Sequence, residues 1–184
     1  MSELLYLQET FEQLRKGHHL SVEDEPAFSA VRTNYDAYAQ YFAPLGFMLV
    51  RHERDFFYFE PKTTDTSPAT LAHIAVFSFI LIDDAANQGK PIEEFVFTTH
   101  FLISRLPHLS LDRYTALLRQ IGVVPDPAGL RSILTKMNGL GWVKLLDGEE
   151  FKFLRPFHRM FDKCRELSDA AAQRSDKPPP SSAE

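Results

Sequence analysis

Three groups of residues are of types that could perform chemistry, and none of them has the pattern of a complete site. His18 and His19 could be a pair of metal ligands, but adjacent side chains point apart and no third ligand is near. Asp83 and Asp84 could act as general acid and base, yet they stand where an apolar segment gives way to polar residues, which indicates solvated surface. Cys164, the single cysteine, lies on an apolar helical stripe that is typical of a core. We therefore predict no catalytic residue, no metal, no cofactor and no enzymatic activity.

The elements that must position any functional residue form a repeat. A cassette that starts with a Leu-Gly pair runs from Gly46 to Pro61, and a second runs from Gly141 to Pro156, with the glycine fifteen positions before the proline in both. Each contains two aromatic or aliphatic runs separated by a polar turn, and each follows a helical pattern. A helix that leads into a two-stranded hairpin is the C-terminal half of a winged helix.

The repeat predicts a helix-dominated α+β protein with tandem winged-helix domains, each ending in a two-stranded wing hairpin. The expected organisation is a first domain at 1–62, a linker and bridging helix at 63–91, a second domain at 92–167 and a disordered tail at 168–184. The bridging helix is apolar on more than one side, so we expect it to be buried between the domains or beneath a partner. Helices are also expected over 93–106 and 157–167.

Charge is divided unevenly along the chain, whose overall net charge is −5. The first 92 residues carry −6 and residues 93–167 carry +2, so only the second domain is expected to meet a phosphate backbone. In a winged helix the helix before the hairpin enters the groove and the wing touches phosphate. The residues of this kind in the second domain are Arg131, Lys136, Lys144, Lys152, Arg155 and Arg159. They predict weak, non-specific contact with double-stranded DNA, or else are ordinary solvated charges.

Aromatic residues are concentrated in the first domain. Consecutive side chains of a strand face opposite ways, so two of the four rings from Phe56 to Phe59 must leave the core face. Rings on a second face indicate an interface, unless the bridging helix covers them within the chain. The residues predicted to bind a partner protein or a second copy are Tyr35, Tyr38, Tyr41, Phe42, Phe57, Tyr58 and Phe59.

Nothing in the sequence favours a membrane or secreted location. The N-terminus has no basic segment ahead of an apolar core. The most apolar stretch, Ile74 to Ile82, is about half the length that a bilayer requires. We expect a cytoplasmic protein without a membrane partner.

The ordered set of motifs resembles the MukE/MksE family over roughly residues 4–165. The motifs that carry the resemblance are Leu14–Leu20, Phe28, Tyr38, Tyr41, Leu49–Arg51, Phe56–Pro61, Leu130–Leu134, Leu140–Val143, Phe151–Phe153 and the helix at 157–165. One departure concerns DNA, because Asn138 and Gly139 stand where the family pattern has several basic residues. That difference weakens the case for DNA contact by the preceding helix.

The resemblance implies a tandem winged-helix ("Kite") subunit of a bacterial condensin. Such a subunit would form a homodimer and bind a kleisin of the MukF/MksF kind, which bridges it to an SMC ATPase at the nucleoid. The complex would serve chromosome condensation and partition or, as in Wadjet relatives, plasmid defence, and the sequence leaves both open. The alternative function is a stand-alone winged-helix transcriptional regulator, which would bind duplex DNA tightly by itself.

Overall fold

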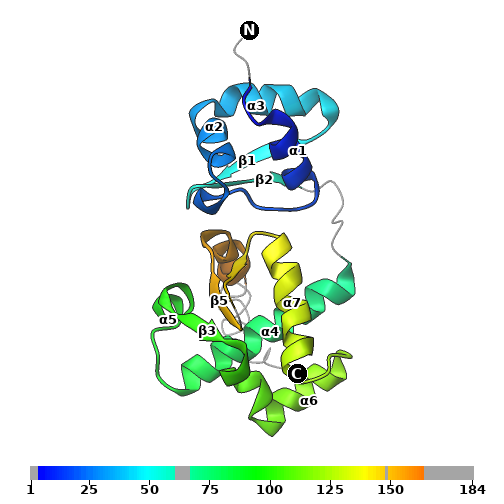
Figure 1. The fold of residues 1–184 in the computed structure, drawn as a ribbon, viewed down its shortest axis with the longest axis vertical. Helices are drawn as coiled ribbons and strands as arrows, with labels where there is room; N and C mark the ends of the chain where they lie inside the picture. The colour runs from blue at the N-terminus through cyan, green and yellow to red at the C-terminus, as the bar shows by residue number, and fades with distance from the viewer. Residues whose placement is uncertain (1–3, 61–66, 148, 164–184) are drawn as a thin grey trace, which may run out of the picture.

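The computed structural model describes residues 4–60, 67–147 and 149–163, and these form a helix-dominated α+β protein with two small sheets. Two groups of elements lie one above the other in Figure 1: a first unit, residues 4–60, and a second unit, residues 67–163. Each unit has a separate hydrophobic core. The predicted disordered tail and Cys164 lie outside the described residues.

The first unit consists of three helices packed on one face of a hairpin. Its elements are α1 (Leu7–Arg15), η1 (Val22–Asp24), α2 (Ala27–Thr33), α3 (Tyr35–Phe42), η2 (Ala43–Leu45), β1 (Met48–His52) and β2 (Phe56–Glu60). Gly46 follows η2 with a φ of 85°, a left-handed conformation that glycine adopts without strain. The chain then enters β1, which pairs antiparallel with β2 from Met48 opposite Glu60 to His52 opposite Phe56. The predicted first hairpin is confirmed.

Strand β2 has two differently occupied faces. Phe57 and Phe59 point into the core of the first unit, where Tyr38 and Phe42 are also fully buried. These four were predicted to bind a partner, and that prediction needs correction because the three helices of the same unit cover them. Phe56 is buried too but belongs to neither core, since it lies on the opposite face of the strand.

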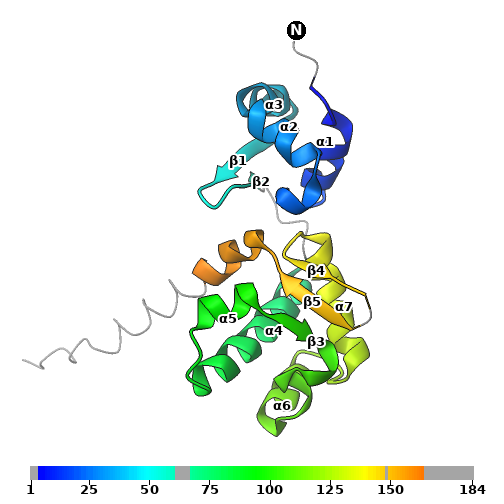
Figure 2. The same cartoon turned by 60° about the vertical axis from the view of Figure 1, so that its left-hand side comes forward.

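The second unit begins with the longest helix and contains a three-stranded sheet (Figure 2). Its elements are α4 (Pro68–Asn87), α5 (Ile92–Thr98), β3 (His100–Leu102), η3 (Ile103–Arg105), η4 (Pro107–Leu109), α6 (Asp112–Gln120), α7 (Pro127–Gly139), β4 (Val143–Leu145), β5 (Glu150–Phe153) and η5 (Arg155–Phe157). The strand order is β3-β5-β4, with both pairs antiparallel. The predicted second hairpin is therefore confirmed, and residues 158–163 are helical as expected.

Strand β3 was missed by the sequence analysis, which predicted one helix over 93–106. The helix ends at Thr98, and Phe101 pairs with Phe151 in β5. Two consecutive threonines shortly before Phe101 and Leu102 favour an extended chain. The pairing partner lies about 50 positions later in the sequence, so the helical spacing upstream of Thr98 outweighed this local signal.

Helix α4 packs into the second unit rather than between the two units, which corrects the bridging role predicted for it. Ile74, Phe77, Ile80 and Leu81 all belong to the core of the second unit. By length and composition alone, α4 is the one helix in the described segments that could cross a membrane. Six of its residues are buried inside the protein, which is typical of a core helix.

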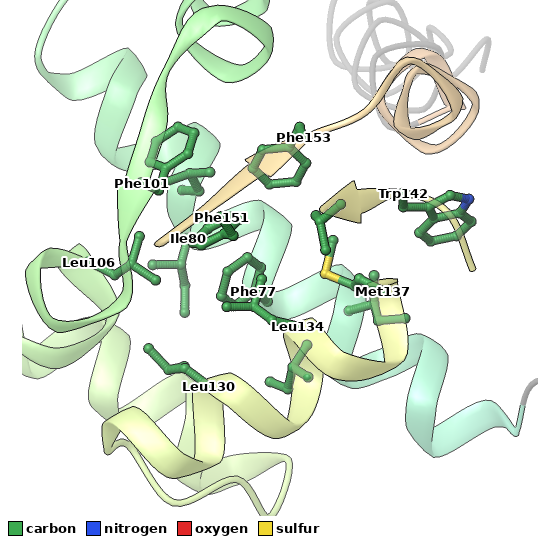
Figure 3. Close-up of a cluster of buried hydrophobic side chains, with 14 of the residues drawn as sticks. Phe77, Ile80, Phe101, Leu106, Leu130, Leu134, Met137, Trp142, Phe151 and Phe153 are labelled. Atoms are coloured by element: carbon green, nitrogen blue, oxygen red, sulfur yellow. The ribbon is translucent and has the colours of Figure 1, made fainter. Parts of the chain in front are cut away.

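Figure 3 shows the core that holds the second unit together. Phe77 from α4 and Phe151 from β5 meet with ring centroids 6.2 Å apart, and Leu130 and Leu134 from α7 close the same cluster. All four side chains are completely buried. Burial of one such side chain stabilises a fold by about 1.5–3 kcal/mol, so this core fixes α7 and the β4–β5 hairpin relative to α4.

Candidate functional site

The two units meet along a polar contact that we call the seam. It is formed by the loop at 17–24 and the hairpin at 52–58 of the first unit, and by residues 138–144, 152 and 158–162 of the second. In Figures 1 and 2 the loop that follows α1 faces the end of α7. Glu93, at the start of α5, adds a further carboxylate. Long-range polar contacts therefore hold together two units with separate cores.

His18 uses one ring nitrogen within the first unit and the other to contact the second unit. Its Nε2 lies 2.9 Å from Oδ1 of Asp24, and its Nδ1 lies 3.0 Å from the carbonyl oxygen of Gly139. Burial alone would lower the pKa of His18, but both acceptors favour the protonated ring, and the pKa is raised above its ordinary value. His18 as an imidazolium donates to both oxygens, and Gly139 lies at the C-terminus of α7, where positive charge is favoured.

His19 is held in the neutral form beside an arginine. Its backbone N–H donates to the carbonyl oxygen of Leu140 at 3.0 Å, and Arg159 donates to its Nε2 at 3.0 Å. Burial, and then the positive charge of Arg159, lower the pKa of His19 to about 3. Because the guanidinium of Arg159 can only donate, Nε2 is the unprotonated nitrogen of the neutral ring, and Nδ1 carries the hydrogen that points to the Leu140 oxygen, 3.1 Å away. The indole nitrogen of Trp142 lies 3.3 Å from the same Nδ1. The guanidinium of Arg159 also lies 4.1 Å from the ring centroid of Tyr58.

One carboxylate of the first unit bridges two lysines of the second. Glu23 accepts from Lys144 at 2.6 Å and from Lys152 at 3.1 Å, one oxygen to each. The two lysines are directly opposite each other on β4 and β5, an arrangement that is repulsive by itself. The hydrogen bond from Lys144 is the main cause that holds the pKa of Glu23 below its usual value, and Lys152 adds to it. The carboxylate therefore stays ionised between two ammonium groups.

A fourth contact places an arginine of the first hairpin among acidic groups of the second unit. Arg54 lies 3.2 Å from Glu93 and 3.4 Å from Asp162. Its Nη1 is also 3.4 Å from Nε2 of His158. Burial, followed by the charge of Arg54, lowers the pKa of His158. Arg54 therefore brings a permanent positive charge of the first unit into contact with acidic side chains of the second.

Gly141 allows the two units to approach closely. Its φ is 71°, and a Cβ added there would lie 2.7 Å from the carbonyl oxygen of His19 and 2.8 Å from Cε1 of His18. The Leu-Gly pair of the second cassette therefore has two functions. It ends a helix with a left-handed residue, and it leaves room for the first unit.

The predicted partner-binding aromatics lie in or against the first core, in the seam, or on the exposed surface. Four are core residues, as described above. Tyr35 is half-buried and donates to the carbonyl oxygen of Leu49, and Tyr58 lies in the seam, stacked on His19. Tyr41 remains half-exposed on α3. The aromatic rings of the second strand face do mark an interface, but in this structure it lies within the chain.

The predicted DNA-binding side chains are divided in the same way. Lys144, Lys152 and Arg159 are engaged in the seam. Arg131 lies 3.9 Å from Glu149, and Lys136 and Arg155 are exposed. Three of these six basic groups therefore contact the first unit. Sequence reasoning missed Glu23, Arg54 and Gly141 as seam residues, although the Leu-Gly repeat pointed to the glycine.

The remaining chemical candidates have structural partners. Asp83 accepts from the hydroxyl of Tyr114 at 2.6 Å and lies 3.4 Å from Arg113, while Asp84 accepts from Gln88. Within residues 4–60, 67–147 and 149–163, no group of three or more His, Cys, Asp or Glu side chains is placed to hold a metal ion. The clusters of titratable side chains in the seam and at Asp83 join helices, strands and loops to one another.

The candidate site is therefore a contact between two small α+β units that is held by charged side chains. The family model of the condensin complex protein MksE matches residues 5–165. The chain therefore belongs to the MksE family, which confirms the resemblance seen in the sequence. Comparison with curated proteins gives no significant match. Family membership makes the chain a protein of a condensin complex.

Proposed function

We propose that the chain is a non-enzymatic accessory subunit that binds a kleisin and, through it, an SMC ATPase. The observation that carries this proposal is the family match over nearly the whole described chain. The element order of the second unit from α5 onward supports it: a helix, a strand, two helices and a hairpin, with the first strand paired to the last. This is the order of a winged helix, and we propose that the first unit is a reduced version of the same design.

We propose that the kleisin binds the apolar surface at the end of α3. Met48 is 59% exposed, and Tyr41 on α3 and Leu45 at the end of η2 are exposed as well. The same region contains an open hollow of about 370 Å³ lined by Ala39, Ala43, Gly46, Phe47, Met48 and Leu49. Adjacent exposed apolar side chains around a hollow are the usual anchor points of protein interfaces. Tyr41 is the one residue of the predicted aromatic set that supports docking on this surface.

A matched pair of variants tests the kleisin surface. Met48→Lys should weaken co-purification with a co-expressed kleisin by at least about tenfold, because it buries a charge in an apolar contact. Val124→Lys is the control, since Val124 is equally exposed but lies between α6 and α7 in the second unit. Equal capture of the kleisin by both variants contradicts the proposed surface, and failure of the wild-type protein to capture it contradicts the proposed function.

We propose that homodimerisation uses the outer side of α4. Leu71, Ala75 and Phe79 are exposed at four-residue spacing, so they form an apolar stripe along one side of the helix. No Asp, Glu, Lys or Arg occurs between Pro68 and Ile82, which leaves the stripe free of charge repulsion against a second copy. Phe79→Glu should convert a dimer to a monomer in light scattering, and an unchanged mass would rule out this interface.

The rival function, a stand-alone DNA-binding regulator, is less well supported. Lys144 and Lys152 are paired with Glu23, so the lysines of the second hairpin are not free to meet phosphate in the closed protein. We propose that DNA contact is weak and non-specific and occurs within the assembled complex at the nucleoid. Chromosome partition and plasmid defence can be distinguished by the neighbouring genes. A topoisomerase-like nuclease next to the kleisin and the ATPase supports defence.

A further inference from the structure

The lysine pair of the second hairpin has the geometry of an anion-binding site. Lys144 and Lys152 stand side by side on β4 and β5 and share one carboxylate, with a lysine on each of its oxygens. A phosphate diester also offers two charged oxygens on one centre. The carboxylate of Glu23 therefore makes the contacts that a backbone phosphate of a nucleic acid would make.

We propose that Glu23 is an internal substitute for phosphate, so that closure of the seam and binding of DNA by the second hairpin exclude each other. This inference rests on the DNA contact proposed above and adds its control. The loop at 17–24 covers the lysines when the units are together and exposes them when the units separate. The partner is the phosphate backbone of duplex DNA, read without base specificity.

The loop holds Glu23 in place by contacts that leave its carboxylate for the lysines. Ser21 caps η1, since its Oγ accepts from the backbone N–H of Glu23 and its own N–H donates to Asp24. Asp24 is also bound by His18, as described above. Asp24 therefore anchors the loop, and Glu23 is the residue of η1 that extends to the second unit.

The contact can be exchanged because it is partly exposed to water. The side chains of Lys144, Lys152 and Glu23 are 47%, 32% and 26% exposed. Exposed ion pairs are weak, so a competing anion does not have to overcome a large energy. Duplex DNA supplies many phosphates and gains free energy from the release of its counterions, which a single acidic side chain does not. Arg155, exposed beside the same sheet, and Lys136, exposed on α7, provide further positive charge on the second unit.

An acidic peptide is the competing kind of ligand, and the charge distribution disfavours it. The first unit next to the lysines is itself acidic, with Glu23, Asp24 and Glu25 in succession. An anionic peptide would meet this repulsion without the gain from counterion release. Poly-glutamate is therefore used as a test ligand alongside DNA.

The test uses the full-length chain and a fluorescein-labelled duplex, with binding measured by anisotropy over a range of salt concentrations. Glu23→Gln should bind the duplex about tenfold more tightly than the wild type at low salt, as expected for loss of two weak ion pairs. Its plot of log K against log salt should be steeper by about two phosphate contacts. Glu9→Gln, which removes the same charge from an exposed position on α1, should bind like the wild type.

The possible results distinguish the role of Glu23 from the DNA contact of the two lysines. The proposal is supported if Glu23→Gln alone gains affinity and if Lys144→Gln with Lys152→Gln in that background removes the gain. An unchanged affinity of Glu23→Gln overturns the proposal that Glu23 excludes DNA. A loss of affinity when Lys144→Gln and Lys152→Gln are made in the wild-type chain would still support the DNA contact. If neither change alters DNA binding, both the exclusion by Glu23 and the proposed DNA contact are wrong. Stronger binding of poly-glutamate than of duplex at equal charge overturns DNA as the partner.

Discussion

Gly141 offers the sharpest test of the seam, since the addition of one methyl group should separate the units. In Gly141→Ala the new Cβ would lie 2.7 Å from the carbonyl oxygen of His19, well inside van der Waals contact, at a φ of 71°. The atom in closest contact is a backbone oxygen and the next belongs to the His18 ring, which is held by Asp24 and Gly139, so the first unit must move away. Gly122→Ala is the matched control, because Gly122 has a similar φ of 76° but no atom within 4 Å of an added Cβ.

The expected magnitude follows from the contacts that the clash would break. An alanine in the left-handed region costs about 1–2 kcal/mol, which both variants share. Separation of the units also removes three hydrogen bonds at Gly141: His19 N–H to Leu140 O, His19 Nδ1–H to Leu140 O, and His18 to Gly139 O. At about 1 kcal/mol each, these add about 3 kcal/mol to the cost of Gly141→Ala alone.

Hydrogen exchange measures this difference at a single amide. The N–H of His19 donates across the seam, so its exchange should be about 100-fold faster in Gly141→Ala than in Gly122→Ala, the factor that corresponds to about 3 kcal/mol. The N–H of Leu20 donates to Phe57 within the first unit and should remain protected in both variants. Equal protection of the His19 amide in the two variants would refute the role assigned to Gly141.

Two further predictions concern the pH response and the second core. Because the pKa of His18 is raised, the stabilisation from its contacts with Asp24 and Gly139 is complete below about pH 6.5 and is lost as the pH rises through the folded-state pKa. The unfolding free energy of the wild type should therefore fall relative to that of His18→Gln as the pH increases from about 6 to about 8. A constant difference in denaturant titrations would contradict this role of the His18 imidazolium. Phe77→Ala should lower the unfolding free energy by about 3–5 kcal/mol, whereas Val124→Ala, at an exposed position between α6 and α7, should stay within about 0.5 kcal/mol of the wild type. Similar losses in the two variants would show that α4 does not pack as described.

The sequence was sufficient to predict features whose determinants are local. Both hairpins follow from a Leu-Gly pair, two apolar runs and a terminal proline, and the structure contains a hairpin at each cassette. The alternation of faces along β2 correctly required that rings leave the core side. It could not identify what they meet, because Phe56 and Tyr58 pack on residues of the loop at 17–24 and of the second unit.

Features that depend on pairing between distant residues could not be predicted. Strand β3 exists because β5 pairs with it, and its own three residues are too few to show a period. Glu23 is one of several acidic residues in the first unit, and nothing local distinguishes it from Glu9 or Glu12. Its role appears only when folding brings it to Lys144, 121 positions later. The burial of Tyr38 and Phe42 was likewise decided by the number of helices that cover the hairpin.

The most direct test of the central claim, that Glu23 closes the first unit over the lysine pair, is a zero-length carbodiimide cross-link. This reagent joins a carboxylate only to an amine in contact with it, and Glu23 lies 2.6 Å from Lys144 and 3.1 Å from Lys152. After digestion of the cross-linked monomer, mass spectrometry should identify peptides that join Glu23 to one of these lysines. Addition of duplex DNA before cross-linking should reduce their yield. If Glu23 forms no such cross-link while its carboxylate reacts freely with an added amine, the units are not closed as described.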